Sequence, residues 1–112
     1  MGPVVFEPNL ASKAALGAGA VGLTALGAHA GGYLSGLSHP ESGHLNPSTL
    51  VHTGMSALPG ALMGGRMAAL TAALGYLAHT AGHGLGRQAA TDHMLGPGHN
   101  ANTVNWHRLP GT

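Results

Sequence analysis

The sequence predicts an all-α protein in which two long glycine- and alanine-rich helices form a hairpin, with a short proline-kinked helix between them. Two uncharged stretches predict the long helices: no formal charge lies between Lys13 and Glu41, and none lies from position 67 to position 86. A third observation argues against sheets: valine and aromatic residues are scarce, isoleucine is absent, and no run alternates apolar with polar residues. The fold class is therefore all-α.

The two long segments have the length of membrane-spanning helices. Residues 14–37 are apolar apart from a few polar side chains and many glycines, and about 20 residues suffice to cross a bilayer. Residues 67–86 are similar in length but only marginally hydrophobic. A simple hairpin of these two helices would place both chain termini on the same side.

A short helix is predicted to begin at Asn46-Pro47-Ser48-Thr49. Asparagine is a favoured N-cap residue, and proline is favoured at the first helical position. This helix should run toward Leu58 and be kinked or ended by Pro59. Residues 1–95 are thus expected to form a helical hairpin domain with a loop at 38–46. Residues 96–112, rich in glycine, proline and asparagine, should form an extended or flexible tail.

The twenty glycines predict close helix packing. Glycine costs roughly 1 kcal/mol relative to alanine in an exposed helix interior, but it lets neighbouring backbones approach. Small residues four apart lie on one helix face. The predicted helix-packing residues are Gly27, Ala28, Gly31, Gly32, Gly36, Gly60, Gly64, Ala78, Gly82, Gly86 and Ala90. Simple compositional bias remains the alternative explanation.

The low charge content predicts a protein that does not stand alone in water. Charged residues make up 6% of the chain, against about 25% in typical soluble domains. The net charge of +1 provides no basic field for nucleic acid. No signal peptide is evident at the start, and a membrane or a virion interior is the expected location. Lys13, Arg66, Arg87 and Trp106 are expected at the membrane interface.

The histidines are the only candidate chemistry. His79 and His83 are four apart and project from one helix face, but no glutamate lies between them, so the HExxH zinc-protease motif is absent. A metal or tetrapyrrole held by His29, His79 and His83 is an open alternative, although no cofactor is expected. Cysteine is absent and no serine has a nucleophile context, so neither an enzyme nor a small-molecule substrate is predicted.

The predicted function is that of a non-enzymatic structural subunit. Its partners are expected to be copies of itself and other subunits of a large assembly, with a membrane as the surrounding medium. The most concrete form of this prediction is a bacteriophage internal or ejection-type virion protein that oligomerises. Two alternatives remain: an accessory transmembrane subunit of a respiratory or photosynthetic complex, and a histidine-based metal- or pigment-binding module.

Overall fold

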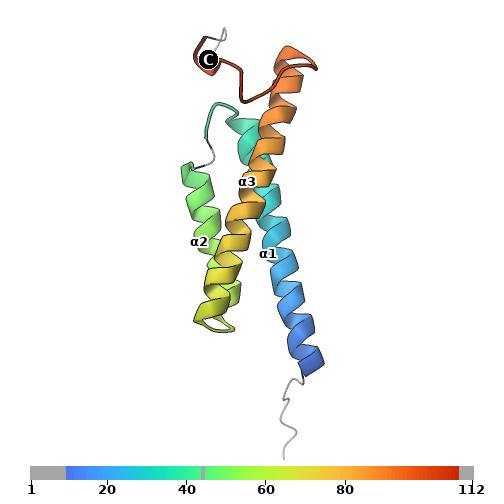
Figure 1. The fold of residues 1–112 in the computed structure, drawn as a ribbon, viewed down its shortest axis with the longest axis vertical. Helices are drawn as coiled ribbons and strands as arrows, with labels where there is room; N and C mark the ends of the chain where they lie inside the picture. Colours follow the sequence, from blue (N-terminus) through green and yellow to red (C-terminus); the bar gives the residue numbers. More distant parts are fainter. Residues whose placement is uncertain (1–9, 44, 109–112) are drawn as a thin grey trace, which may run out of the picture.

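The computed structural model of the chain describes residues 10–43 and 45–108, which form three α-helices and one short 3₁₀ helix (Figure 1). The helices are α1 (Leu10–Ser38), α2 (Pro47–Ala61), α3 (Gly65–Leu95) and η1 (Trp106–Arg108). The described residues contain no strand. The predicted all-α fold, with a long helix, a short helix and a second long helix, is confirmed.

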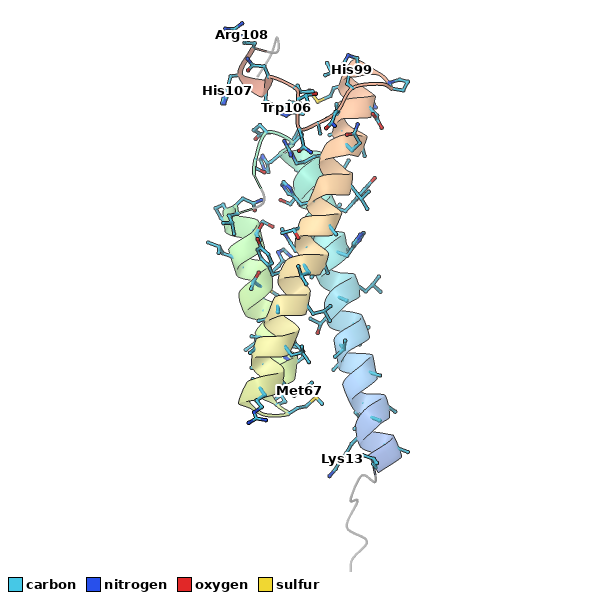
Figure 2. The ribbon with its side chains drawn as sticks, in the orientation of Figure 1. Lys13, Met67, His99, Trp106, His107 and Arg108 are labelled. Atoms are coloured by element: carbon cyan, nitrogen blue, oxygen red, sulfur yellow. The ribbon has the colours of Figure 1, made fainter. Side chains whose placement is uncertain are left out.

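The short helix α2 returns the chain along the bundle, so α1 and α3 run in the same direction (Figure 1). Their register shows this directly, because Gly32 of α1 lies against His79 of α3 and Gly36 lies against His83. As a result, Lys13 near the start of α1 and Arg108 lie at opposite ends of the molecule (Figure 2). The expectation that both chain ends lie on one side is therefore wrong for the described ends. The reason is that α2 carries the chain back along the bundle, so that α3 starts at the same end as α1.

The helix ends follow local sequence signals. The side chain of Asn46 accepts a hydrogen bond from the Thr49 amide at 3.0 Å, and Pro47 is the first residue of α2. Pro59 lies inside α2, which ends two residues later at Ala61. Gly64 precedes α3 with a φ of 121°, a conformation that residues with a Cβ rarely adopt.

Residues 96–108 fold over the C-terminal end of α3 and contain one 3₁₀ turn. Arg87 holds this segment by donating to Asn102 Oδ1 at 2.8 Å, and Gln88 donates to the carbonyl oxygen of His99 at 2.6 Å. Trp106 is buried, and its indole Nε1 donates to the carbonyl oxygen of Ala101 at 3.3 Å. The segment therefore lies at the end of the molecule away from Lys13 (Figure 2).

Candidate functional site

The interior of the bundle is polar. Several polar side chains of α2, of α3 and of the loop before α2 are buried. They are Asn46, Thr49, Ser56, Thr71, His79, His83 and Thr91. His79 and His83 are the largest fully buried side chains, each with 0% exposure. The buried hydrophobic residues are Ala28, Ala90, Ala101 and Trp106, so no described leucine belongs to the core.

The exterior of the same bundle is strongly apolar. Leucine, valine and methionine side chains point outward on all three helices: Leu16, Leu23, Leu26, Leu34, Leu50, Val51, Met55, Leu58, Leu70, Leu77 and Leu85. Leu23 is 73% exposed and Leu77 is 62% exposed. Monomeric soluble proteins rarely expose contiguous apolar patches larger than a few hundred Å². This distribution is the reverse of that in a water-soluble domain.

Glycine makes the contact between α1 and α3. A Cβ on Gly32 would overlap the carbonyl oxygen of His79, and a Cβ on Gly82 would overlap that of His29. The next turn repeats the arrangement, with Gly36 against the carbonyl of His83 and Gly86 against that of Tyr33. We call these four residues, Gly32, Gly36, Gly82 and Gly86, the glycine seam. It brings the two parallel backbones into direct contact, as small-residue interfaces do between membrane helices.

The other predicted packing residues have varied surroundings. Ala28 and Ala90 are buried, and Ala78 is half-buried. Gly60 lies against Met67 and Thr71 at the contact of α2 with α3, and Gly31 lies against the ring of His52. Gly27 and Gly64 do not lie in a contact face, because a Cβ at either position would meet nothing within 4 Å. Gly27 is exposed on α1, and Gly64 serves as the backbone cap of α3.

Three histidines line up inside the bundle. The ring of His52, on α2, lies 4.8 Å from that of His79 between centroids, and His79 lies 6.4 Å from His83. We call His52, His79 and His83 the histidine file. His29, the third predicted ligand, is half-buried on α1, and its carbonyl faces Gly82. The structure therefore groups His79 and His83 with His52, a residue that sequence reasoning did not select.

Hydroxyl and amide groups connect the histidine file. Ser48 Oγ lies 3.2 Å from His79 Nε2 and 3.4 Å from His52 Nδ1. His52 Nδ1 also lies 2.8 Å from the backbone carbonyl oxygen of Ser48. At the other end, His83 Nε2 lies 3.1 Å from Ser42 Oγ and 3.3 Å from Asn46 Nδ2. Buried imidazoles thus have hydrogen-bonding partners in place of water.

A groove of about 530 Å³ lies between α1 and α2. Its lining residues are Ala20, Leu23, Thr24, Gly27, Ala28, His52, Met55, Ser56 and Pro59. Most of these side chains are apolar or small, and the titratable residue among them is His52. The groove extends from His52 along α2 to Pro59, in the half of the bundle nearest the α2–α3 turn.

The charged groups lie near the two ends. Lys13 lies at one end, with Arg66 in the first turn of α3 beside Met67 (Figure 2). Arg87 lies toward the other end, where its Nε donates to the carbonyl oxygen of Pro40 at 2.6 Å. The structure thus separates Lys13 from Arg87, and the fourth predicted interface residue, Trp106, is buried rather than exposed.

One described helix, α1, is long and apolar enough to cross a membrane by length and composition. The lower hydropathy of α3 has a structural cause, because its histidines, threonines and glycines face inward while Leu70, Leu77 and Leu85 face outward. No group of three or more His, Cys, Asp or Glu side chains within residues 10–43 and 45–108 is arranged to hold a metal ion.

The inward-facing residues follow a signal that sequence reasoning missed. In α2 the polar or small residues Ser48, His52, Ser56 and Gly60 recur every fourth position. In α3, Thr71, Gly75, His79 and His83 recur in the same way. A stripe with this period marks one helix face, and here the buried face is the polar one.

Comparison with known proteins gives no relative: no protein-family model, curated protein or solved structure matches the chain.

Proposed function

We propose that the chain is a non-enzymatic structural subunit that inserts into a lipid bilayer and packs there with copies of itself or with other subunits. The observation that carries this proposal is the reversed distribution of side chains. Imidazoles and hydroxyls are buried inside the bundle, while leucines such as Leu23 and Leu77 are exposed on its outside. In water this arrangement forgoes the hydrophobic stabilisation of folding, whereas in lipid it covers the polar groups and leaves the apolar ones in apolar surroundings.

The spacing of the charges supports the same proposal. Arg66 and Arg87 on α3 are separated by about 32 Å of helix at 1.5 Å per residue. The hydrocarbon core of a bilayer is about 30 Å thick. Between these two levels the described helices carry no Asp, Glu, Lys or Arg side chain. Both arginines would therefore lie at the membrane surfaces.

Within this proposal we favour a resident membrane subunit over an ejection-type virion protein. The glycine seam closes α1 directly on α3, and the histidine file fills the space between α2 and α3. This close packing at both interfaces of α3 supports a resident subunit rather than a channel within a single bundle. Ejection-type proteins would have to form their channel between copies, through the exposed leucines.

Liposome flotation followed by carbonate extraction tests the insertion. We expect the full chain to float and to resist extraction. Replacing Leu70, Leu77 and Leu85 by glutamine should abolish flotation while circular dichroism still reports helix, because each of these side chains is more than half exposed. The matched control replaces the same three residues by methionine and should float. A wild-type chain that stays in the aqueous fraction as a monomer contradicts the proposal.

Release of a trapped dye separates the two settings. A resident subunit should insert without releasing the dye, because the glycine seam and the histidine file close the two interfaces of α3. An ejection-type protein should insert and release it. Once insertion has been established, dye release from the same vesicles therefore distinguishes a resident subunit from an ejection-type protein.

A further inference from the structure

We propose that a cavity at the C-terminal end of α3 binds the headgroup of a phospholipid that carries an ammonium group, either ethanolamine or choline. The cavity has a volume of about 460 Å³, which is within the usual range of small-molecule sites. Four segments line it: the end of α1 with Leu37 and Ser38, the following turn with Pro40 and Glu41, Met94 of α3, and η1 with Trp106 and His107. The inference rests on the proposed membrane location, because that location brings lipid headgroups to the cavity.

One wall of the cavity is held in place by hydrogen bonds. The amide of Ser42 donates to the carbonyl oxygen of His39 at 3.0 Å, which closes the turn that carries Glu41. Arg87 Nε donates to the carbonyl oxygen of Pro40 in the same turn at 2.6 Å. The turn is therefore tied to α3, and Glu41 is presented from a fixed backbone.

The lining combines apolar surface with one carboxylate. Trp106 is buried, and its indole Nε1 already donates to the carbonyl oxygen of Ala101, so the ring offers apolar surface to the cavity. Leu37 and Met94 add aliphatic surface, and Glu41 is the acidic residue of the lining. An ammonium group is attracted both by a carboxylate and by an aromatic ring. The lining therefore suits a cation on an apolar stem.

Glu41 keeps the capacity to receive such a cation. Its Oε1 lies 3.4 Å from His39 Nδ1, and the two side chains are 52% and 67% exposed. A carboxylate has about four acceptor positions, so one neighbour does not saturate it. His107 also lines the cavity, and an imidazole N–H can donate to a phosphate oxygen. The lining residues include no lysine or arginine, so they favour a zwitterionic headgroup over one with a net negative charge.

The cavity lies at the depth of the lipid headgroups in the proposed orientation. Gly36 packs against the backbone nitrogen of Arg87, so Leu37 and Ser38 lie near the level of this arginine, at the membrane surface. Met94 lies further along α3 by about 10 Å at 1.5 Å per residue. The headgroup layer extends about 5–8 Å beyond the hydrocarbon core on each side. The cavity therefore spans this layer, and Trp106 and His107 lie at the same end of the molecule (Figure 2).

The outer face of α1 provides a path for the acyl chains. Leu34 lies one turn before Ser38 on the same face, and Ser38 Oγ donates to the Leu34 carbonyl oxygen at 2.8 Å. Leu26 continues this face toward the middle of the helix, and the two leucines are 62% and 67% exposed. A lipid whose headgroup occupies the cavity can lay its chains along this face. A free ammonium compound lacks that contact and should bind more weakly.

The fluorescence of Trp106 tests the site directly, because Trp106 is the single tryptophan of the chain and lines the cavity. The full chain in maltoside micelles is titrated with short-chain phosphatidylcholine or phosphatidylethanolamine. We expect a saturable change in emission. Phosphatidylglycerol with the same chains, which has the phosphate but no ammonium group, should bind at least about tenfold more weakly, because it cannot pair with Glu41.

A matched pair of variants tests the carboxylate. Glu41→Gln removes the charge of the cavity at an exposed side chain and should weaken phosphatidylcholine binding by about tenfold or more. Asp92→Asn removes the same charge from an exposed position on α3 outside the lining and should bind like the wild type. The Asp92 side chain accepts a hydrogen bond from Gln88, which asparagine can also accept. Circular dichroism verifies that both variants keep their helices.

Four results would overturn the assignment. The wild type shows no saturable response, phosphatidylglycerol binds as tightly as phosphatidylcholine, or Glu41→Gln binds like Asp92→Asn. The fourth is free phosphocholine that binds as tightly as the lipid, because the site would then take a soluble ammonium compound. Each of these results leaves membrane insertion intact, whereas failure of the wild type to float contradicts the proposed function itself.

Discussion

The two interfaces of α3 differ in what fills them. Toward α1, glycines such as Gly32 and Gly82 place backbone directly against backbone. Toward α2, the histidine file and the hydroxyl of Ser48 fill the space with hydrogen-bonded side chains. Neither interface contains a buried leucine. The two interfaces of α3 therefore obtain their contacts from close backbone approach on one side and from polar pairing on the other, without a core of buried leucines.

The largest effect is expected where the glycine seam is broken. Gly82→Leu places a branched side chain against the carbonyl oxygen of His29, and the backbone has no room to yield without separating α1 from α3. We expect a loss of at least about 1–3 kcal/mol, the usual cost of overpacking. Thermal unfolding in detergent micelles, followed by circular dichroism, measures it.

The control for this variant is Gly84→Leu, two residues along the same helix. A Cβ at Gly84 meets nothing within 4 Å, and leucine is the better helix former. Its unfolding temperature should equal or exceed that of the wild type. Equal losses at positions 82 and 84 would mean that the glycine seam does not hold the long helices together.

The amino-acid sequence alone predicts one of these two interfaces better than the other. Small residues four apart are visible in the sequence, and their spacing is sufficient to select Ala28, Gly32, Gly36, Gly82 and Gly86. Gly27 and Gly64 fit the same spacing but lie outside the contacts. The spacing of small residues identifies one face of a helix. Which neighbouring helix packs against that face depends on the arrangement of all three helices, and local sequence does not encode this arrangement.

The polar interface is harder to predict, because polar stripes on helices usually face water. Local signals identify Asn46 as the cap of α2 and place His79 and His83 on one face of α3. The role of His52 depends on the antiparallel pairing of α2 with α3, which brings residues of distant sequence position together. The same pairing makes α1 and α3 parallel. A prediction of a simple two-helix hairpin makes the two long helices antiparallel and therefore misses this arrangement.

A moderate effect is expected at the polar interface. His79→Leu keeps a side chain of similar size but removes a hydrogen-bonding partner of Ser48. The expected cost is about 1–2 kcal/mol, because a buried polar group that loses its partner remains desolvated, while interhelical hydrogen bonds in membranes are individually modest. The same unfolding measurement applies, with His93→Leu as the exposed control. A more stable His79→Leu variant would show that the histidine file lowers stability.

A smaller effect is expected at the start of α2, which positions Ser48 and His52 for the polar interface. Asn46→Ala removes the hydrogen bond from the Thr49 amide to Asn46 Oδ1. Loss of an N-cap typically costs about 1 kcal/mol. Ser38→Ala is the control, since Ser38 is exposed and its hydroxyl bonds within its own helix, to the Leu34 carbonyl. If both variants unfold alike, the cap does not contribute to the interface.

The smallest effect on folding is expected at the outer surface, where Leu77→Ala tests whether apolar residues hold the bundle together. In a conventional core, leucine-to-alanine replacement costs about 2–5 kcal/mol. Leu77 is 62% exposed, and alanine is at least as good a helix former, so the unfolding temperature in micelles should stay unchanged. Partition into liposomes should fall instead, because apolar area that faces lipid is lost. A variant that unfolds early but still partitions fully would place Leu77 in a protein contact, and the stabilising contacts would then extend beyond the glycine seam and the histidine file.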